Sequence, residues 1–218
     1  MQGRDVQISP LDLAGILNVP RGGNAVVLFA HGSGSSRLSP RNTQVAAALS
    51  EAGLGTLLFD LLTEPEAADR ANVFDIGLLA ERLFLATDWL RAQAGLRQAR
   101  IGYFGASTGA AAALVAATFA NNDVGAIVSR GGRPDLAGAA LAEVKAPTLL
   151  IVGGDDDVVI ELNRTALAQL RCEKRLEIVP GATHLFEEPG TLEQVMALAR
   201  HWFQDHLLGG PAKRQRHV

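Results

Sequence analysis

The hydrophobic residues of the chain fall into two patterns, which alternate along most of its length. Short, nearly continuous apolar runs are typical of strands buried on both faces of a parallel sheet. Longer segments in which apolar residues recur every three or four positions are typical of helices with one buried face. The predicted strands are residues 25–30, 55–59, 101–104, 125–129, 148–152 and 175–179. The predicted helices are residues 40–52, 73–94, 108–114, 136–142, 160–170 and 191–207.

Three segments fall outside this alternation. Residues 6–8 and 11–17 predict a hairpin within the N-terminal region, residues 1–24. Residues 63–72 are polar and acidic and contain a proline, so we expect a long loop there. A Gly-Gly-Pro step and a basic stretch close the chain, and we expect residues 209–218 to form a frayed tail.

The alternation predicts an α/β fold with a mostly parallel central sheet and helices on both faces, because crossovers between parallel strands are right-handed. The 218 residues, 48% of them hydrophobic, are enough for one domain with a large core. No repeat, linker or insertion large enough for a cap domain interrupts them, so we predict a single domain over residues 1–218. Ligands of such sheets bind at the carboxyl ends of the strands.

Charge and cysteine content narrow the class of protein. A formal net charge of −3 and an isoelectric point near 5.9 provide no general field for nucleic acid. The single cysteine excludes an internal disulfide framework. No apolar leader is visible, and no stretch approaches the ~20 apolar residues of a membrane-spanning helix. We therefore expect a cytoplasmic monomer or homodimer without nucleic-acid or membrane partners.

Candidate chemistry appears first at the turn after residues 101–104. There Gly105-Ala106-Ser107-Thr108-Gly109 joins a strand to an alanine-rich helix and places one serine at the apex. A turn this tight strains the serine backbone and requires small residues two positions before and after it, which the two glycines supply. The G-x-S-x-G pattern in this context makes Ser107 the candidate nucleophile.

A serine nucleophile needs a base, and histidine is the usual one at neutral pH. His201 and His206 lie in the last predicted helix and His217 lies in the tail. His31 begins a glycine-rich loop, where its ring is expected to hold the loop. His184 follows the last predicted strand on a short loop at the catalytic edge, and we predict that it is the base.

An acid that orients the base is expected at another strand end. Asp155, Asp156 and Asp157 follow residues 148–152, and three carboxylates cannot all be buried and ionised at one turn. The G-x-x-D-x-x-V spacing favours Asp156, with the other two solvated. A merely solvated turn is the alternative for all three. Other carboxylates left open, as the acid or as lining residues, are Asp60, Glu64 and Glu66.

Negative charge on the attacked carbonyl oxygen needs preorganised N–H donors, each typically worth ~3 kcal/mol. The N–H of Thr108, at the start of the helix, is the first candidate. The second is expected from the loop after residues 25–30, where we favour the N–H of Ser33 over that of Gly34. Candidate substrate-binding residues along the cleft are Gly34, Ser35, Arg37, Glu64, Arg130 and Leu185.

These motifs, in the order serine, aspartate, histidine, resemble the α/β-hydrolase superfamily, and within it the small, cap-less dienelactone-hydrolase-like group. The resemblance covers residues 26–207. It is carried by LFAHGSGS (28–35), FDLLT (59–63), GASTG (105–109), GGDD (153–156) and GATH (181–184). It implies the α/β-hydrolase fold, the same triad and oxyanion residues, and no metal or organic cofactor.

One feature departs from that family. Dienelactone hydrolases carry a cysteine nucleophile, whereas Ser107 stands here, which favours ordinary ester hydrolysis. Arginines bind a substrate carboxylate in the family, so Arg130 and Arg133 are candidates for that role, with solvated or structural arginines as the alternative.

The function predicted from the sequence is therefore a serine carboxylesterase, of the EC 3.1.1 class, that cleaves small esters or lactones through an acyl-enzyme. Without a helical cap, the site is expected to be open, shallow and selective for short acyl groups. The alternatives are dienelactone hydrolase proper, thioesterase, amidase or acyltransferase activity, and a non-catalytic hydrolase-fold protein that binds a ligand.

Overall fold

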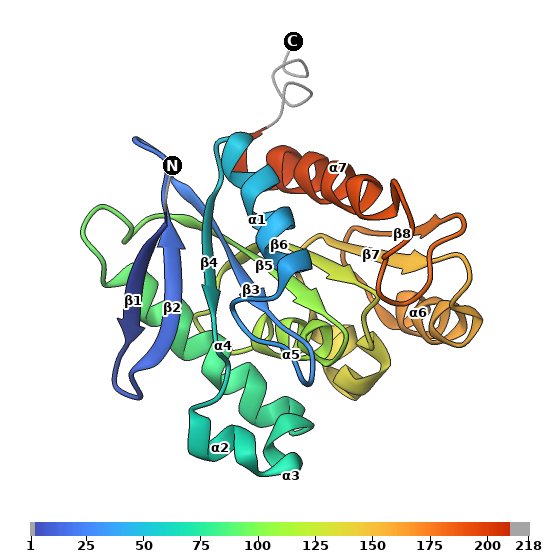
Figure 1. Cartoon of the computed structure of the whole chain (residues 1–218), viewed down its shortest axis with the longest axis horizontal. Coiled ribbons are helices and arrows are strands. Elements are labelled where there is room, and N and C mark those ends of the chain that lie inside the picture. The colour runs from blue at the N-terminus through green and yellow to red at the C-terminus, as the bar shows by residue number, and fades with distance from the viewer. Residues whose placement is uncertain (1–2, 210–218) are drawn as a thin grey trace.

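A mixed sheet of eight strands organises the fold (Figure 1). The computed structural model describes residues 3–209. Within them the strand order is β1-β2-β4-β3-β5-β6-β7-β8. The strands are β1 (Arg4–Ile8), β2 (Leu13–Asn18), β3 (Ala25–Ala30), β4 (Gly55–Phe59), β5 (Arg100–Ala106), β6 (Val124–Arg130), β7 (Thr148–Gly153) and β8 (Lys174–Val179).

Six of these strands run parallel, and the N-terminal hairpin extends the sheet at one edge. β1 pairs with β2 and β2 with β4 in antiparallel register, whereas every pair from β4 across to β8 is parallel. The carboxyl ends of β3, β5, β6 and β7 therefore meet at one edge of the sheet. This arrangement confirms the α/β-hydrolase fold class.

Helices cover both faces of the sheet. The helix α1 (Pro40–Glu51) packs with α7 (Thr191–Phe203) on one face, and α4 (Ile76–Arg91) packs with α5 (Thr108–Ala116) on the other. The remaining helical segments are α2 (Glu64–Ala68), α3 (Arg70–Val73), α6 (Asp157–Gln169), the 3-10 segment η1 (Pro134–Glu143) and the π-helical turn η2 (Gln204–Gly209).

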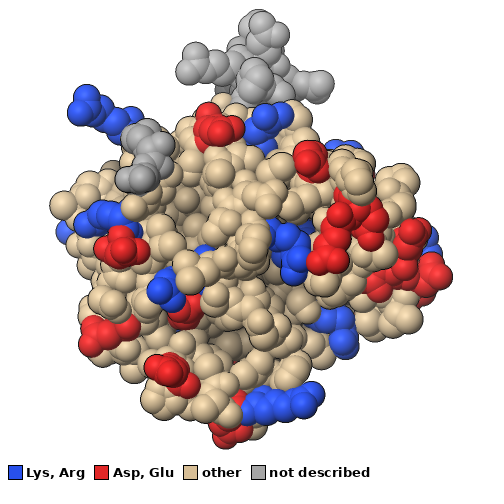
Figure 2. Space-filling model, in the orientation of Figure 1, with Lys and Arg blue, Asp and Glu red and all other residues tan. Residues whose placement is uncertain are grey.

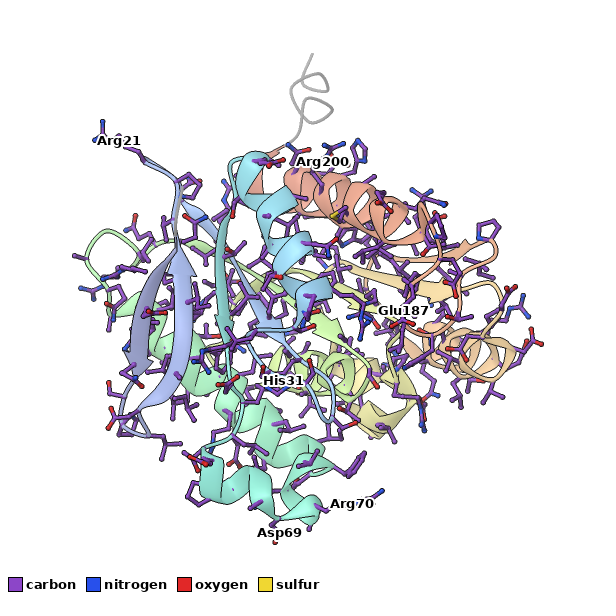
Figure 3. All side chains as sticks on the ribbon, viewed as in Figure 1. Arg21, His31, Asp69, Arg70, Glu187 and Arg200 are labelled. Carbon is purple, nitrogen blue, oxygen red and sulfur yellow. The ribbon has the colours of Figure 1, made fainter. Side chains whose placement is uncertain are left out.

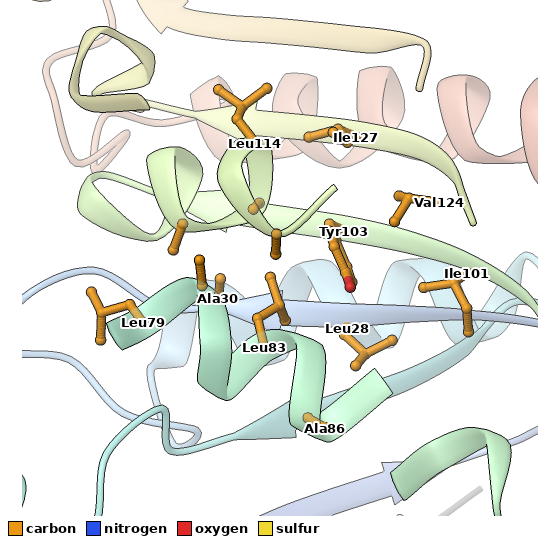
Figure 4. Close-up of a cluster of buried hydrophobic side chains, with 14 of the residues drawn as sticks. Leu28, Ala30, Leu79, Leu83, Ala86, Ile101, Tyr103, Leu114, Val124 and Ile127 are labelled. Carbon is orange, nitrogen blue, oxygen red and sulfur yellow. The ribbon is translucent and has the colours of Figure 1, made fainter. Parts of the chain in front are cut away.

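The two faces explain why the central strands lack polar alternation. Along β3, Leu28 and Ala30 belong to the core under α4 and α5 (Figure 4), whereas Val27 and Phe29 belong to the core under α1 and α7. Every residue of β3 is therefore buried. Burying one aliphatic or phenyl side chain stabilises the fold by about 1.5–3 kcal/mol. The buried side chains of β3 therefore hold this strand in register with its neighbours.

One buried polar cluster crosses the core under α4. The Tyr103 hydroxyl lies 2.7 Å from the Thr87 hydroxyl and accepts a hydrogen bond of 3.0 Å from the Asn122 side chain. Burial raises the pKa of Tyr103 to about 12, so this tyrosine stays protonated.

The segment 63–72 is helical, and the prediction of a long loop was wrong. A capping box explains the difference: Glu66 N–H donates to the Thr63 hydroxyl, and Thr63 N–H donates to the Glu66 carboxylate. Asp69 then caps the next turn by accepting from Ala71 N–H. Two short helices, α2 and α3, therefore stand beside the catalytic edge, below β4 in Figure 1.

Charged side chains of both signs are interspersed over the face seen in Figure 2, most of which carries neither sign. Acidic side chains gather toward the side where α6 and β8 lie. Among residues 3–209, no helix combines the length and hydrophobicity that crossing a bilayer requires. The expected frayed tail, residues 209–218, lies outside the described residues apart from Gly209.

Candidate active site

Ser107 lies at a strained turn between β5 and α5. Its φ of 50° and ψ of −122° lie in a region that residues other than glycine rarely adopt, at a typical cost of about 1–3 kcal/mol. The turn leaves no room for larger neighbours, since a Cβ atom on Gly105 would lie 2.4 Å from Ala110 Cα. One on Gly109 would lie 2.1 Å from Ala30 O. The two glycines of the motif are therefore required by close packing.

Asp156 and His184 are brought together from the ends of β7 and β8. The His184 Nδ1 donates to Asp156 Oδ2 at 2.7 Å, which leaves Nε2 free to act on a substrate. Asp155 and Asp157 are exposed, whereas the Asp156 side chain is 16% exposed. The turn after β7 approaches the His184 loop so closely that a Cβ on Gly153 would meet Ala182 O at 2.4 Å.

A cavity of about 620 Å³ joins the nucleophile candidate to the base candidate. Ser107 and His184 both line it, together with Arg130, Leu185 and the loop 32–36. Among residues 3–209 no hydrogen bond joins Ser107 to His184; such contacts often tighten only when substrate binds.

Hydrogen bonds hold the loop after β3 at both of its ends, beside Ser107. The His31 Nδ1 donates to Gly32 O at 3.0 Å, and Nε2 accepts from Leu61 N–H at 3.1 Å. Burial lowers the pKa of His31, consistent with a neutral ring in this role. Figure 3 shows His31 near the ends of β3 and β4, on the side where α2 to α4 lie.

Asp60 fixes the other end of the loop. One carboxylate oxygen accepts from Arg37 N–H at 2.7 Å, and the other forms an ion pair with the Arg37 guanidinium. This carboxylate is therefore engaged by the loop and does not face His184. Between the two ends, a Cβ on Gly32 would lie 2.9 Å from Ser107 Cβ.

The two candidate oxyanion donors lie next to each other. Ser33 N–H donates to Thr108 Oγ1 at 3.2 Å, so the loop is joined to the first residue of α5. The backbone N–H of Thr108 belongs to the first turn of that helix, where no intrahelical acceptor exists. A carbonyl oxygen placed between these N–H groups would also experience the positive end of the helix dipole.

Arg130 is a buried cation in the wall of the cavity. Its side chain donates to Asn42 Oδ1 at 3.2 Å, and its guanidinium carbon lies 5.9 Å from the centre of the Phe186 ring. Within the described part of the chain, residues 3–209, its Nε has no hydrogen-bond partner. Burial, followed by the charge of Arg41, lowers the pKa of Arg130 to about 10. No carboxylate among residues 3–209 forms an ion pair with it.

The other predicted lining residues are divided between the cavity wall and places outside it. Arg133 forms a two-bonded pair with Asp135, at 2.9 and 2.8 Å, and is not part of the cavity wall. Glu66 pairs with Arg82, and Arg37 pairs with Asp60. Gly34 and Ser35 line the cavity as expected, and Glu64 lines a second cavity beside it.

That second cavity, of about 290 Å³, was not predicted. Its walls come from the loop 32–36, the residues after β4, and α2 to α4. The T-x-x-E signature of the capping box at residues 63–66 is the sequence signal that indicates these helices. Among residues 3–209, no group of three or more histidine, cysteine or acidic side chains is placed to hold a metal ion.

Comparison with solved structures gives relatives over nearly the whole chain. A dienelactone hydrolase from Anabaena variabilis ATCC 29413 is 56% identical with a TM-score of 0.89, covering 94% of this chain and 97% of that one. Est1E from Butyrivibrio proteoclasticus is 14% identical with a TM-score of 0.78, covering 95% and 100%, and shows the shared fold alone.

Curated proteins add a longer relative. A Mycobacterium tuberculosis (strain ATCC 25618 / H37Rv) protein, provisionally named a phosphoribosyl transferase, is 59% identical over 215 residues. The match covers 97% of this chain and 48% of the relative, so the chain spans about half the length of that protein. The model of the dienelactone hydrolase family matches residues 17–206. The chain therefore belongs to the dienelactone hydrolase family.

Proposed function

We propose that the chain is a serine carboxylesterase, of the EC 3.1.1 class, that cleaves carboxylic esters or lactones through an acyl-enzyme. One observation carries this proposal: the strained turn presents Ser107 to the cavity that His184 also lines, and His184 is bonded to Asp156 at 2.7 Å. A serine, an imidazole whose second nitrogen faces the substrate and a largely buried carboxylate that orients the ring are the groups that acyl transfer requires.

The proposed reaction begins when Ser107 Oγ attacks the ester carbonyl carbon while His184 Nε2 accepts the hydroxyl proton. Asp156 stabilises the imidazolium and holds the ring in the required tautomer. The carbonyl oxygen becomes negative and is stabilised by Thr108 N–H and Ser33 N–H. For this, Ser33 N–H gives up its hydrogen bond to Thr108 Oγ1 and donates to the oxyanion instead. His184 then protonates the leaving alkoxide, and a water molecule activated by the same ring hydrolyses the acyl-enzyme.

Arg130 favours a second candidate within the same chemistry, dienelactone hydrolysis proper. Arg130 is 6% exposed, lines the cavity and has no carboxylate partner among residues 3–209. Such a buried charge is costly unless a substrate anion compensates it. We propose that Arg130 binds a carboxylate of the substrate when one is present. A dienelactone beside a neutral ester in the assay distinguishes the two candidates.

The triad variants test the proposal. We expect Ser107→Ala, His184→Ala and Asp156→Asn each to lower kcat/KM for p-nitrophenyl acetate by about 10⁴-fold or more, with little change in Tm. Asp155→Asn is the matched control, because this neighbour is exposed and Asp156 is the carboxylate that is bonded to His184. The activity of Asp155→Asn should stay within about twofold of wild type. If Ser107→Ala retained wild-type kcat/KM, the assignment of Ser107 as the nucleophile would be wrong. Equal losses of kcat/KM in Asp155→Asn and Asp156→Asn would contradict the role of Asp156 in orienting His184.

A further inference from the structure

The loop 32–36 separates two cavities of different chemistry. Its five residues line both cavities, whereas Ser107 and His184 line only the larger one. The smaller cavity is closed by residues that follow β4 and by α2, α3 and α4, the group seen below the sheet in Figure 1. Thr108, whose N–H is a proposed oxyanion donor, lines this smaller cavity.

The smaller cavity presents mainly hydrocarbon. Its side walls are Leu61, Leu62, Ala67, Val73 and Leu79. The polar side chains around it are engaged or solvated: both ring nitrogens of His31 are hydrogen-bonded, Asp60 pairs with Arg37, and Glu64 is exposed. An apolar group would therefore be favoured over a charged one in this space.

The position of His184, the proposed base, decides which half of an ester enters the smaller cavity. His184 must protonate the leaving alkoxide, so the alcohol half lies in the larger cavity, where His184 and Arg130 are. With the carbonyl oxygen between Ser33 N–H and Thr108 N–H, the acyl half would lie on the side of the carbonyl away from His184. The loop 32–36 and Thr108, which carry the two donors, border the smaller cavity.

We propose that the cavity walled by Leu61, Leu62, Ala67, Val73 and Leu79 is the acyl-binding site, and that the substrates are esters of apolar acids larger than butyrate. The inference rests on the proposed esterase function. An apolar protein cavity of about 150 Å³ holds benzene; one of about 290 Å³ has room for a phenylpropanoyl or a linear six- to eight-carbon acyl group. The expectation of a shallow site for short acyl groups, drawn from the missing cap, is replaced by this proposal.

A chain-length series tests the acyl site directly. For p-nitrophenyl esters from acetate to decanoate, kcat/KM should rise about fourfold per added methylene, the value for burying one CH₂, until the cavity is filled near hexanoate or octanoate. Ala67→Trp, an exposed position at the wall, should lower the octanoate-to-acetate ratio of kcat/KM at least tenfold. Ala68→Trp is the matched control on the same helix, exposed but not lining the cavity, and should leave the ratio unchanged.

Leu62→Ala provides a second, opposite change, because it enlarges the cavity and should shift the optimum toward longer acyl groups. Equal ratios in wild type, Ala67→Trp and Leu62→Ala, or a steady fall of kcat/KM from acetate onward, would overturn the acyl site while leaving the esterase function standing. No hydrolysis of any ester, acetate included, would overturn both proposals.

Discussion

Ser107 and His31 illustrate how single residues prepare this site in opposite ways. Ser107 stores strain in its backbone, which glycines at 105 and 109 permit and which close packing against Gly32 maintains. His31 instead restricts the motion of the loop 32–36, because its ring bonds to Gly32 O within the loop and to Leu61 N–H after β4. In the proposed reaction, the attacking serine and the loop that carries an oxyanion donor are therefore both positioned before substrate binds, which is the basis of electrostatic preorganisation.

His31 should make stability depend on pH. Its pKa is lowered in the folded state from an ordinary value of 6.5, so below about pH 6.5 the unfolded chain binds more protons. The free energy of unfolding should therefore fall as the pH drops from 7.5 to 5. His31→Gln keeps an acceptor near Leu61 N–H without the titration, so its curve should be flatter than the wild-type curve. Urea unfolding of both proteins across this range measures the difference, and parallel curves would contradict the assignment.

Residue types and spacing were enough to predict that Ser107, Asp156 and His184 lie at one edge of the sheet, because each follows a recognisable strand. Spacing could not show that Arg130 is buried against Asn42, which comes from a helix 88 positions earlier in the chain. Nor could it separate Arg130 from Arg133, since only the folded loop pairs Arg133 with Asp135. Local sequence patterns thus predict residues that lie at strand ends, whereas the partners of side chains such as Arg130 depend on packing between distant segments.

At the scale of elements, α2 and α3 form part of the wall of the smaller cavity, which would otherwise be an open edge beside the sheet. Glu66 supports α2 twice, by capping with Thr63 and by pairing with Arg82. The hydrogen bond from Thr63 N–H is the main cause that lowers the pKa of Glu66, so the cap is retained in its charged form at neutral pH. A polar segment with a proline predicts a loop unless this reciprocal cap is recognised.

Removing the N-cap side chain of α2 should destabilise this helix, which forms part of the wall of the smaller cavity, without changing Ser107, Asp156 or His184. Thr63→Ala should lower the free energy of unfolding by about 1 kcal/mol, the usual cost of losing an N-cap side chain. The octanoate-to-acetate ratio should fall with it, since α2 carries Ala67. Thr165→Ala, at an exposed position inside α6, is the control and should change stability by less than about 0.5 kcal/mol. Equal effects of both substitutions on the ester ratio would show that α2 does not shape the site.

At the scale of the whole molecule, the site exists only because distant strands end together. Ser107 follows β5, Asp156 follows β7 and His184 follows β8, and the loop 32–36 follows β3. The alternation of apolar runs and helical patterns predicted a mostly parallel sheet with helices on both faces, and β3 and β4 have the predicted bounds. The chain spans about half the length of the mycobacterial relative.

The central claim is that Ser107 is the nucleophile of an assembled triad, and covalent labelling tests it most directly. A fluorophosphonate should add one label per chain, seen by intact-protein mass spectrometry, and peptide mapping should place it on Ser107. Ser107→Ala should remain unlabelled, His184→Ala should label far more slowly, and Asp155→Asn should label at the wild-type rate. An unlabelled wild-type protein, or equal labelling of Ser107→Ala, would contradict the claim.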